Sequence, residues 1–250
     1  MESYGLSEQG PYRAENQDTF RISPEGIGVL AVVCDGMGGA AGGRLASDMA
    51  AESFTSFSSI SLELSDGSED EDILRLAVTA ANRKIYEFAY DNEEYAGMGT
   101  TLVGGVFRPD RALLVNVGDS RAYRISRDGI TRLTKDHSLV QQMVDAGELT
   151  YEQARRHPRR NIITRAVGTE PFVTSDIFEA PAREGDIFLL CSDGLTGAVE
   201  DPELHRLTLA APDAESACRA LIDTALARGT RDNVTAVVII YGKESADNAE

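Results

Sequence analysis

The sequence predicts an α+β fold in which two antiparallel sheets pack face to face and helices cover their outer faces. Helical periodicity is found towards both ends of the chain, and most predicted strands are grouped between these helices. Several strands are continuous apolar runs, which indicates burial on both faces. The 250 residues contain no internal repeat and no break in composition, so they predict one large domain.

The first part of the chain predicts a buried strand followed by two helices. The Val-rich run 28–34 is the strand. Apolar residues recur at helical spacing over 42–57 and again over 70–91. Acidic residues crowd the first turn of the second helix, where they complement the positive end of the helix dipole.

Short strands dominate the middle of the chain. The runs 99–107, 111–118 and 120–126 are close together and joined by turn residues, which predicts an antiparallel meander. Towards the C-terminus we expect a buried strand at 185–192, a helix at 213–228 and a β-branched final strand at 233–242.

A polar, basic segment separates these two groups of elements. Residues 137–168 fit two short helices and a loop, and we interpret them as a small subdomain inserted into a domain of residues 1–242. Residues 243–250 then form a polar tail.

The charge balance limits the possible partners. Asp and Glu total 41 against 24 Lys and Arg, a formal net charge of −17. Such a surface repels nucleic acid and anionic membranes. No apolar run approaches the ~20 residues that span a bilayer, and the N-terminus does not resemble a signal peptide. We therefore expect a cytoplasmic protein that binds neither nucleic acid nor membrane, with a monomer as the simplest state.

Local sequence argues against two nucleophile chemistries. A cysteine-dependent phosphatase needs an arginine six positions after its cysteine, but the residues there are Ala40, Gly197 and Thr224. The segment GDSRA at 118–122 only faintly resembles a serine-hydrolase elbow, because it lies between two strands and no late histidine follows in a suitable motif.

Four aspartates share a context at strand ends. Asp35 and Asp193 follow buried strands, Asp119 lies in the link between two strands, and Asp232 precedes the last strand. Strand ends of layered sheets gather at one edge, where crowded carboxylates raise one another's pKa. Mg²⁺ or Mn²⁺, which prefer oxygen ligands, would relieve this repulsion. Each Asp-Gly pair alone is also typical of an ordinary turn, so spacing leaves both interpretations open.

Eight motifs, in the same order, resemble those of the metal-dependent PP2C (PPM) protein phosphatases in their compact bacterial form. They are RAENQD (13–18), VCDGMGG (33–39), GTTL (99–102), VGDSRAY (117–123), LTKDHS (133–138), NIITRAVG (161–168), LLCSDGL (189–195) and RDNVT (231–235). The similarity covers about residues 4–241. It implies a four-layer αββα sandwich, in agreement with the layering above, and a flap beside the active site at residues 137–168.

The resemblance also implies hydrolysis of phosphoserine and phosphothreonine in proteins by a water or hydroxide that bridges two Mn²⁺ or Mg²⁺ ions. Carried over position by position, Asp35 would bridge both ions, and Asp193 and Asp232 would complete the first ion's protein ligands. The second ion would take Asp35 and the Gly36 carbonyl, with Asp18 acting through water.

A third, weaker ion would be held by Asp119 and Asp193, as in bacterial members of the family. This matters because many relatives, chiefly eukaryotic ones, place a histidine where this chain has Met37, and that histidine is the proposed general acid. Methionine cannot donate a proton, so water near the third ion would have to do so, unless the leaving group is acidic enough to need no help.

The resemblance assigns the substrate contacts to Arg13 and Asn233. Arg13 would grip the phosphate, because a guanidinium can bind two of its oxygens at once, and Asn233 would help to hold the site's waters. Gln17 replaces a glutamate that some relatives use on the second ion, which would weaken that ion's binding. We interpret His137 as a structural residue that bonds within its own turn.

The implied partners are phosphorylated proteins, including a Ser/Thr kinase or its substrates, which the enzyme would oppose. A phosphatase-fold binding or regulatory protein with weak or no turnover is the alternative function, although Arg13 and the key aspartates are all present. The flap arginines could receive an acidic protein segment, but we favour a solvated helix end; they are Arg155, Arg156, Arg159 and Arg160.

Overall fold

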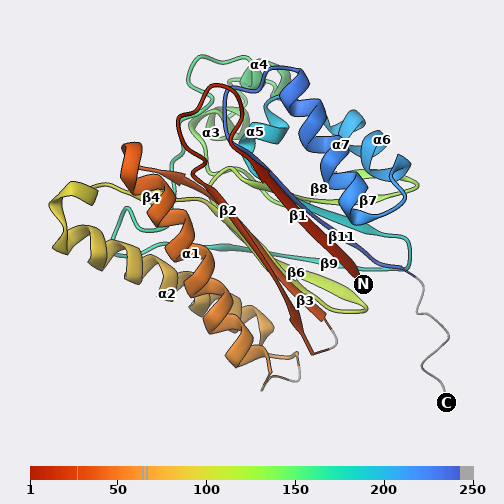
Figure 1. Cartoon of the computed structure of the whole chain (residues 1–250), viewed down its shortest axis with the longest axis horizontal. Helices are drawn as coiled ribbons and strands as arrows, with labels where there is room; N and C mark the ends of the chain where they lie inside the picture. Colours follow the sequence, from red (N-terminus) through yellow and green to blue (C-terminus); the bar gives the residue numbers. More distant parts are fainter. Residues whose placement is uncertain (27, 64, 66, 243–250) are drawn as a thin grey trace.

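The computed structural model describes residues 1–26, 28–63, 65 and 67–242, so the predicted tail at 243–250 lies outside the described residues. These residues form two antiparallel sheets that pack face to face (Figure 1). The first sheet has the order β1 (Glu2–Glu8), β11 (Val234–Ile240), β10 (Ile187–Cys191), β7 (Arg121–Ser126) and β8 (Gly129–Arg132).

The second sheet contains the long strand predicted near the N-terminus. Its order is β2 (Asp18–Glu25), β3 (Gly28–Met37), β5 (Leu102–Phe107), β6 (Arg111–Val117) and β9 (Asp176–Pro181), and the short β4 (Gly99–Thr100) pairs with β3. At the first position where β2 and β3 pair, Asp18 lies opposite Asp35. Two residues predicted to serve the same metal are therefore brought together by strand pairing alone.

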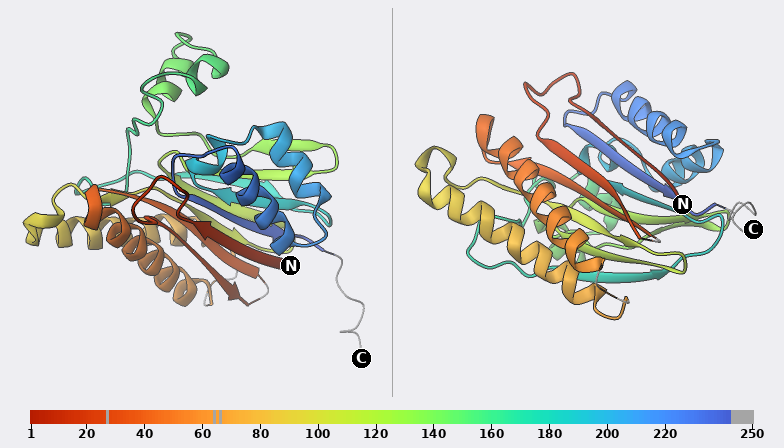
Figure 2. Two further views of the ribbon diagram at one scale, coloured as in Figure 1. Left: turned by 45° about the horizontal axis from the view of Figure 1, so that its top comes forward. Right: turned by 60° about the horizontal axis from the view of Figure 1, so that its bottom comes forward.

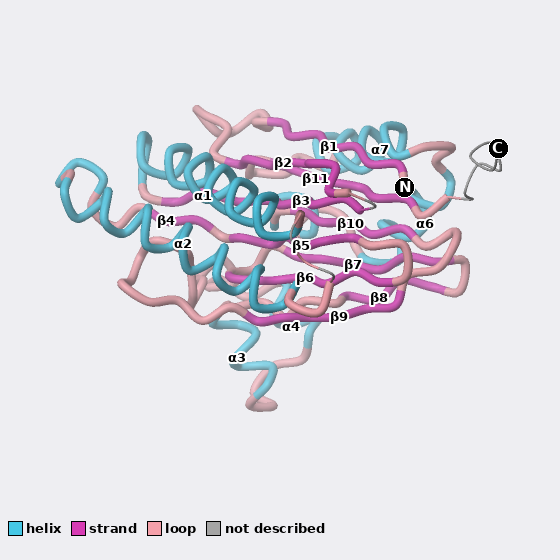
Figure 3. Tube along the Cα trace, turned by 90° about the horizontal axis from the view of Figure 1, so that it is seen from below, coloured by secondary structure: helices cyan, strands magenta, loops and turns pink. Residues whose placement is uncertain are grey.

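Helices cover the outer face of each sheet (Figures 1 and 3). The antiparallel pair α1 (Gly39–Leu62) and α2 (Asp70–Asp91), followed by the 3₁₀ turn η1 (Glu93–Tyr95), packs on the second sheet. The first sheet carries α5 (Asp193–Thr196), α6 (Asp201–Ala210) and α7 (Ala214–Ala227). Among the described residues, no helix combines the length and the apolar character needed to cross a membrane.

Three apolar layers hold this arrangement together. One lies between the first helix pair and its sheet, and includes Phe54 and Leu74. A second lies between the two sheets, where Phe107 and Phe188 meet edge to face with ring centroids 5.5 Å apart. The third lies under α6 and α7. The predicted four-layer αββα sandwich is therefore confirmed, and its central strands are buried on both faces.

Most predicted elements are confirmed, but the meander is wrong. The helix predicted at 70–91 is α2, and the strand predicted at 28–34 lies within β3. Strands β5 and β6 do pair, whereas β7 pairs with β10 and β8 in the other sheet. The link at Gly118–Ser120 therefore carries the chain from one sheet to the other, and Asp119 lies in that crossing.

The segment between β8 and β9 projects from the sandwich (Figure 2, left). It carries α3 (Leu139–Asp145) and α4 (Tyr151–Arg155), each with an N-cap hydroxyl, Ser138 and Thr150 respectively. Two short helices with a loop were predicted here, and both are present. The bounds 137–168 for the flap and 1–242 for the domain stay predictions.

Candidate active site

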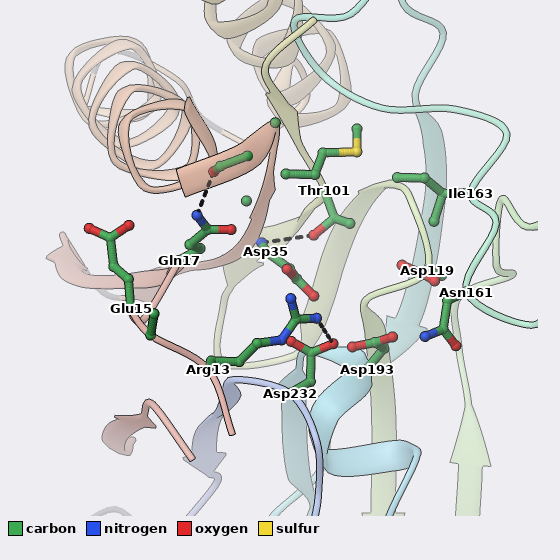
Figure 4. A pocket seen from close by; sticks show the side chains of 15 residues that line it. Arg13, Glu15, Gln17, Asp35, Thr101, Asp119, Asn161, Ile163, Asp193 and Asp232 are labelled. Atoms are coloured by element: carbon green, nitrogen blue, oxygen red, sulfur yellow. Dashed lines mark hydrogen bonds and ion pairs between the residues drawn. The ribbon is translucent and has the colours of Figure 1, made fainter. Parts of the chain in front are cut away.

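A pocket of about 470 Å³ opens where the two sheets bring their strand ends together, and Figure 4 shows its side chains. Asp35 reaches it from the end of β3, Asp119 from the link after β6, and Asp193 from the start of α5. Asp232, just before β11, completes the set. The structure thus gathers the four aspartates that the sequence places far apart.

The pocket is strongly acidic. Its lining includes these four aspartates and Glu15, whereas Arg13 is the one basic side chain among the described residues that line it. Arg13 donates from Nη2 to Asp232 Oδ2 over 2.6 Å, and this hydrogen bond is the main cause that raises the pKa of Arg13. Arg13, predicted to bind the phosphate, is therefore paired with Asp232, a predicted metal ligand.

Burial and mutual repulsion make the carboxylates reluctant to ionise. Burial is the largest cause of the raised pKa of Asp35, and the charges of Asp18 and Asp193 add to it. The pKa of Asp119 is also raised well above its ordinary value, first by burial and then by Asp193. For Asp193 itself, burial and the charge of Asp232 raise the pKa to about 6.

Asp18 lies beneath the pocket rather than in its lining. Its side chain is buried, and this burial raises its pKa to about 7 even though two hydrogen bonds act to lower the pKa. The hydroxyls of Ser192 and Thr235 each donate to Asp18 Oδ2 over 2.7 Å. Neither hydroxyl was singled out in the sequence, because Ser and Thr inside strand-end motifs carry no pattern of their own.

The donor set fits divalent cations. Two buried carboxylate oxygens, Asp18 Oδ1 and Asp193 Oδ1, have no hydrogen-bond partner. Such atoms are costly in a protein interior unless a cation or water binds them. Among the described residues no three Asp, Glu, His or Cys side chains are arranged closely enough to hold a metal ion as they stand. The carboxylates share one pocket, but their oxygens do not yet converge. Hard oxygen donors in an acidic pocket suit Mg²⁺ or Mn²⁺.

Gly36 lets the end of β3 pack closely against the start of α1. A Cβ atom at this position would overlap the carbonyl oxygen of Gly43 at the start of α1, so no side chain fits. The Gly36 amide donates to the Gln17 carbonyl over 3.1 Å. The Gln17 side chain donates to the Gly39 carbonyl over 2.8 Å and lines the pocket. Gln17 therefore holds the N-terminus of α1 against the site.

Asn233 lies beside the pocket, behind the loop that carries Arg13. Its side chain donates to the carbonyls of Gln9 (2.8 Å) and Glu15 (3.0 Å) and accepts from the Gln17 amide (2.9 Å). It is buried and does not line the pocket. This geometry fastens the loop that carries Arg13, whereas contact with substrate stays a prediction.

His137 does not bond within its own turn, so that prediction is wrong. Its ring Nδ1 accepts from the Gly118 amide over 3.0 Å, and its own amide donates to the Gly118 carbonyl over 2.9 Å. Its carbonyl accepts from the Thr164 amide. His137 thus fastens the Asp119 link to both ends of the flap, a contact that separations of 19 and 27 residues hide from local sequence patterns.

Three further residues of the lining come from the flap and from the link between β4 and β5. Asn161 and Ile163, on the returning chain of the flap, face the acidic cluster in Figure 4. Thr101 accepts a hydrogen bond from the Asp35 amide (2.9 Å) and shares another with Ser120 (2.7 Å). The Thr101 hydroxyl therefore ties the Asp35 strand to the Asp119 link. Met37 also lines the pocket.

Comparison with known proteins agrees with this geometry. A family model described as protein phosphatase 2C matches residues 13–231. The serine/threonine phosphatase stp of Listeria innocua is 33% identical over 234 residues, which is 93% of each chain. A crystal structure of a bacterial serine phosphatase superimposes with a TM-score of 0.90 at 35% identity, covering 98% of this chain and 100% of the other.

A structure of the catalytic domain of the serine threonine protein phosphatase PstP, in complex with two manganese ions, superimposes with a TM-score of 0.83 at 33% identity. It covers 94% of this chain and 96% of the other. The family match includes Arg13, Asp35, Asp119 and Asp193 and ends one residue before Asp232. The chain belongs to the protein phosphatase 2C family.

Proposed function

We propose that this protein hydrolyses phosphoserine and phosphothreonine in proteins with the help of divalent cations, Mn²⁺ or Mg²⁺. The observation that supports this most is the convergence of Asp35, Asp119, Asp193 and Asp232 on one pocket whose single basic group, among the described residues, is Arg13. A phosphate monoester is anionic, and such a pocket would repel it unless cations were bound.

The proposed ligands of two core ions are Asp35, Gly36 through its carbonyl, Asp193 and Asp232, with Asp18 acting through water. When bound, the ions would lower the pKa of a shared water and neutralise the phosphate oxygens. The orphaned oxygens of Asp18 and Asp193 support this assignment. A third, weaker ion would take Asp119 and Asp193. The same oxygen donors suit both Mn²⁺ and Mg²⁺, so the proposal includes either ion.

Arg13 is the group that orients the phosphate. Its guanidinium already reaches the pocket, and about half of its side chain is exposed (48%), so it can turn from Asp232 to a substrate. A planar guanidinium can donate to two phosphate oxygens together. Asn233 keeps the Arg13 loop in place through its bonds to Gln9 and Glu15.

Departure of the serine or threonine alkoxide requires a proton. Met37 lines the pocket but has none to give. We assign this step to a water held near Asp119, on the side of the pocket from which Asn161 also faces inward. A leaving group that is already acidic would need no such proton.

The proposed partners are phosphorylated proteins, among them a Ser/Thr kinase or its substrates, and the proposed location is the cytoplasm. Names of the relatives support a serine/threonine phosphatase, and the monomeric state stays a prediction. The alternative is a protein of the same fold that binds a phosphoprotein and turns it over weakly or not at all.

The decisive assay uses purified protein with p-nitrophenyl phosphate and with phosphoserine, phosphothreonine and phosphotyrosine peptides. We expect turnover only with added Mn²⁺ or Mg²⁺, and preference for the first two peptides. Asp232→Asn, which keeps the shape of the side chain, should abolish it. Undiminished turnover in excess EDTA would contradict the metal dependence, and binding of phosphopeptides without turnover would favour the alternative.

A further inference from the structure

A second cavity adjoins the acidic pocket beneath the flap. Its volume is about 810 Å³, and Asp119, Asn161 and Asp193 line both cavities. The flap helices α3 and α4 form one side, and the strand β7 with the start of α6 forms the other. A molecule bound in the acidic pocket could therefore extend directly into this groove.

The walls of the groove differ in charge from the acidic pocket. Three arginines of the flap line it, Arg155, Arg156 and Arg160. Arg156 pairs with Glu152 one turn earlier (2.7 Å), and Arg155 only reaches Glu200 at 4.0 Å. Within the described residues Arg160 has no side-chain partner. In a chain of net charge −17, this side of the groove carries three arginines, of which one is firmly paired.

Away from the acidic pocket the groove has two acidic residues, Asp136, which is neutralised by arginines, and Asp201, which keeps its charge. Asp136 pairs with Arg121 over 2.6 Å and with Arg132 over 3.6 Å. Asp201 accepts a hydrogen bond from the Tyr123 hydroxyl. The groove is therefore polarised: Asp119 and Asp193 lie where it meets the acidic pocket, and the flap side carries the three arginines.

An apolar surface lies between these two ends. Val140 and Val144 on α3 and Ala154 on α4 line it. Tyr151 is exposed (61%), and the centroid of its ring lies 5.7 Å from the Arg132 guanidinium carbon. An aliphatic stem followed by a charged tip, such as a glutamate side chain, matches this combination of apolar wall and basic rim.

We propose that this groove binds the segment of the substrate protein next to the phosphorylated residue, and that it selects segments with acidic side chains. The proposal rests on the phosphatase function proposed above and adds the class of substrate to it. Charge complementarity is the argument: an acidic segment would be repelled by most of this protein's surface but is met here by three arginines. The helix-end interpretation of these arginines from the sequence does not account for their place in the lining of a groove that is continuous with the site.

The test compares two phosphothreonine peptides of equal length, one with glutamates flanking the phosphothreonine and one with glutamines at the same positions. The variants are Arg155→Gln, Arg160→Gln and the double variant. Arg83→Gln is the matched control, because Arg83 is an exposed arginine of α2 that pairs only with Glu87. Melting temperatures show whether each variant is folded.

We expect the KM for the acidic peptide to rise about three-fold for each single variant and about ten-fold for the double variant, with kcat unchanged. The glutamine peptide and p-nitrophenyl phosphate should be hydrolysed as by the wild type, and higher salt should remove the wild type's preference. Equal KM changes for both peptides, or no preference in the wild type, would overturn the proposal.

Fluorescence anisotropy of the labelled peptides, in EDTA, separates this proposal from the proposed function. The acidic peptide could bind more tightly to the wild type than to the double variant although no substrate is hydrolysed. That result would contradict the proposed phosphatase function and support the assignment of the groove to acidic segments. If turnover is normal and both peptides bind equally to wild type and variant, the groove assignment fails alone.

Discussion

Asp18 and Asp35 are register partners on the paired strands β2 and β3, so the fold places the carboxyl group of Asp18, outside the pocket lining, beside that of Asp35, which lines the pocket. The charge of Asp18 adds to the raised pKa of Asp35, and the charges of Asp193 and Asp232 add to the raised pKa of Asp18. Nothing in the pairing of two strands requires this, since a pair of alanines would be less costly. The arrangement is a cost to stability that the proposed cations would reduce.

This cost predicts an unusual dependence of stability on pH. The pKa values of Asp18 (about 7) and Asp193 (about 6) lie above the ordinary value near 4, and those of Asp35 and Asp119 are also raised. Between about pH 4 and pH 7 the folded state therefore binds more protons than the unfolded state, so the free energy of unfolding falls as pH rises through this window. The raised pKa values of Asp35 and Asp119 act in the same direction.

We expect the melting temperature in EDTA to fall by several degrees between pH 4.5 and pH 7.5. Excess Mn²⁺ should flatten this decline, because it stabilises the ionised carboxylates. Asp18→Asn should also reduce the slope, whereas Asp145→Asn should not, since Asp145 is exposed and its pKa is lowered by Lys135. A melting temperature in EDTA that rises over this window would contradict the assignment.

How much of this could be predicted from sequence depends on the place of each element in its sheet. The central strands β3, β5, β6, β10 and β11 are continuous apolar runs, and all were predicted. The strands that were missed, β1, β2, β8 and β9, are the edges of the two sheets. An edge strand is half exposed and carries polar residues, so its pattern differs little from that of a loop.

The site shows the same division. The aspartates and Arg13 could be found, because acidic residues after apolar runs form a pattern and the family motifs name them. Thr101, Ser192 and Thr235 could not, since a lone hydroxyl has no pattern and its role depends on a partner up to 217 residues away. The change of sheet at Asp119 was also hidden, because a short strand–link–strand segment predicts a hairpin whichever sheet the second strand joins.

The hydroxyls around Asp18 give a second prediction. Ser192 and Thr235 both donate to Asp18 Oδ2, which favours the ionised form and leaves Oδ1 unpaired towards the site. Thr235→Val keeps the shape but removes one donor, and Ser192→Ala removes the other. We expect each to weaken Mn²⁺ binding about ten-fold, as is typical for residues that orient a metal ligand.

Titration calorimetry of Mn²⁺ binding measures this effect without turnover. Thr235→Ser keeps the hydroxyl and should bind Mn²⁺ like the wild type, which separates loss of the donor from loss of packing. Each donor removed should also lower the melting temperature by a few degrees, because a buried hydrogen bond contributes about 1 kcal/mol. Wild-type affinity in Thr235→Val and Ser192→Ala would show that these hydroxyls do not orient Asp18 towards a metal.

The last prediction separates the roles of two aspartates that lie in the same pocket. Asp193 is proposed to bind a core ion, so Asp193→Asn should abolish turnover of every substrate. Asp119, in the link after β6, is proposed to serve proton delivery to the leaving group, since Met37 cannot. Phosphothreonine releases a basic alkoxide that needs a proton, whereas p-nitrophenyl phosphate releases a stable phenolate that does not. Asp119→Asn should therefore lower kcat for a phosphothreonine peptide about a hundred-fold and for p-nitrophenyl phosphate only a few-fold. Equal losses on the two substrates would remove Asp119 from leaving-group chemistry and place it with the core ligands.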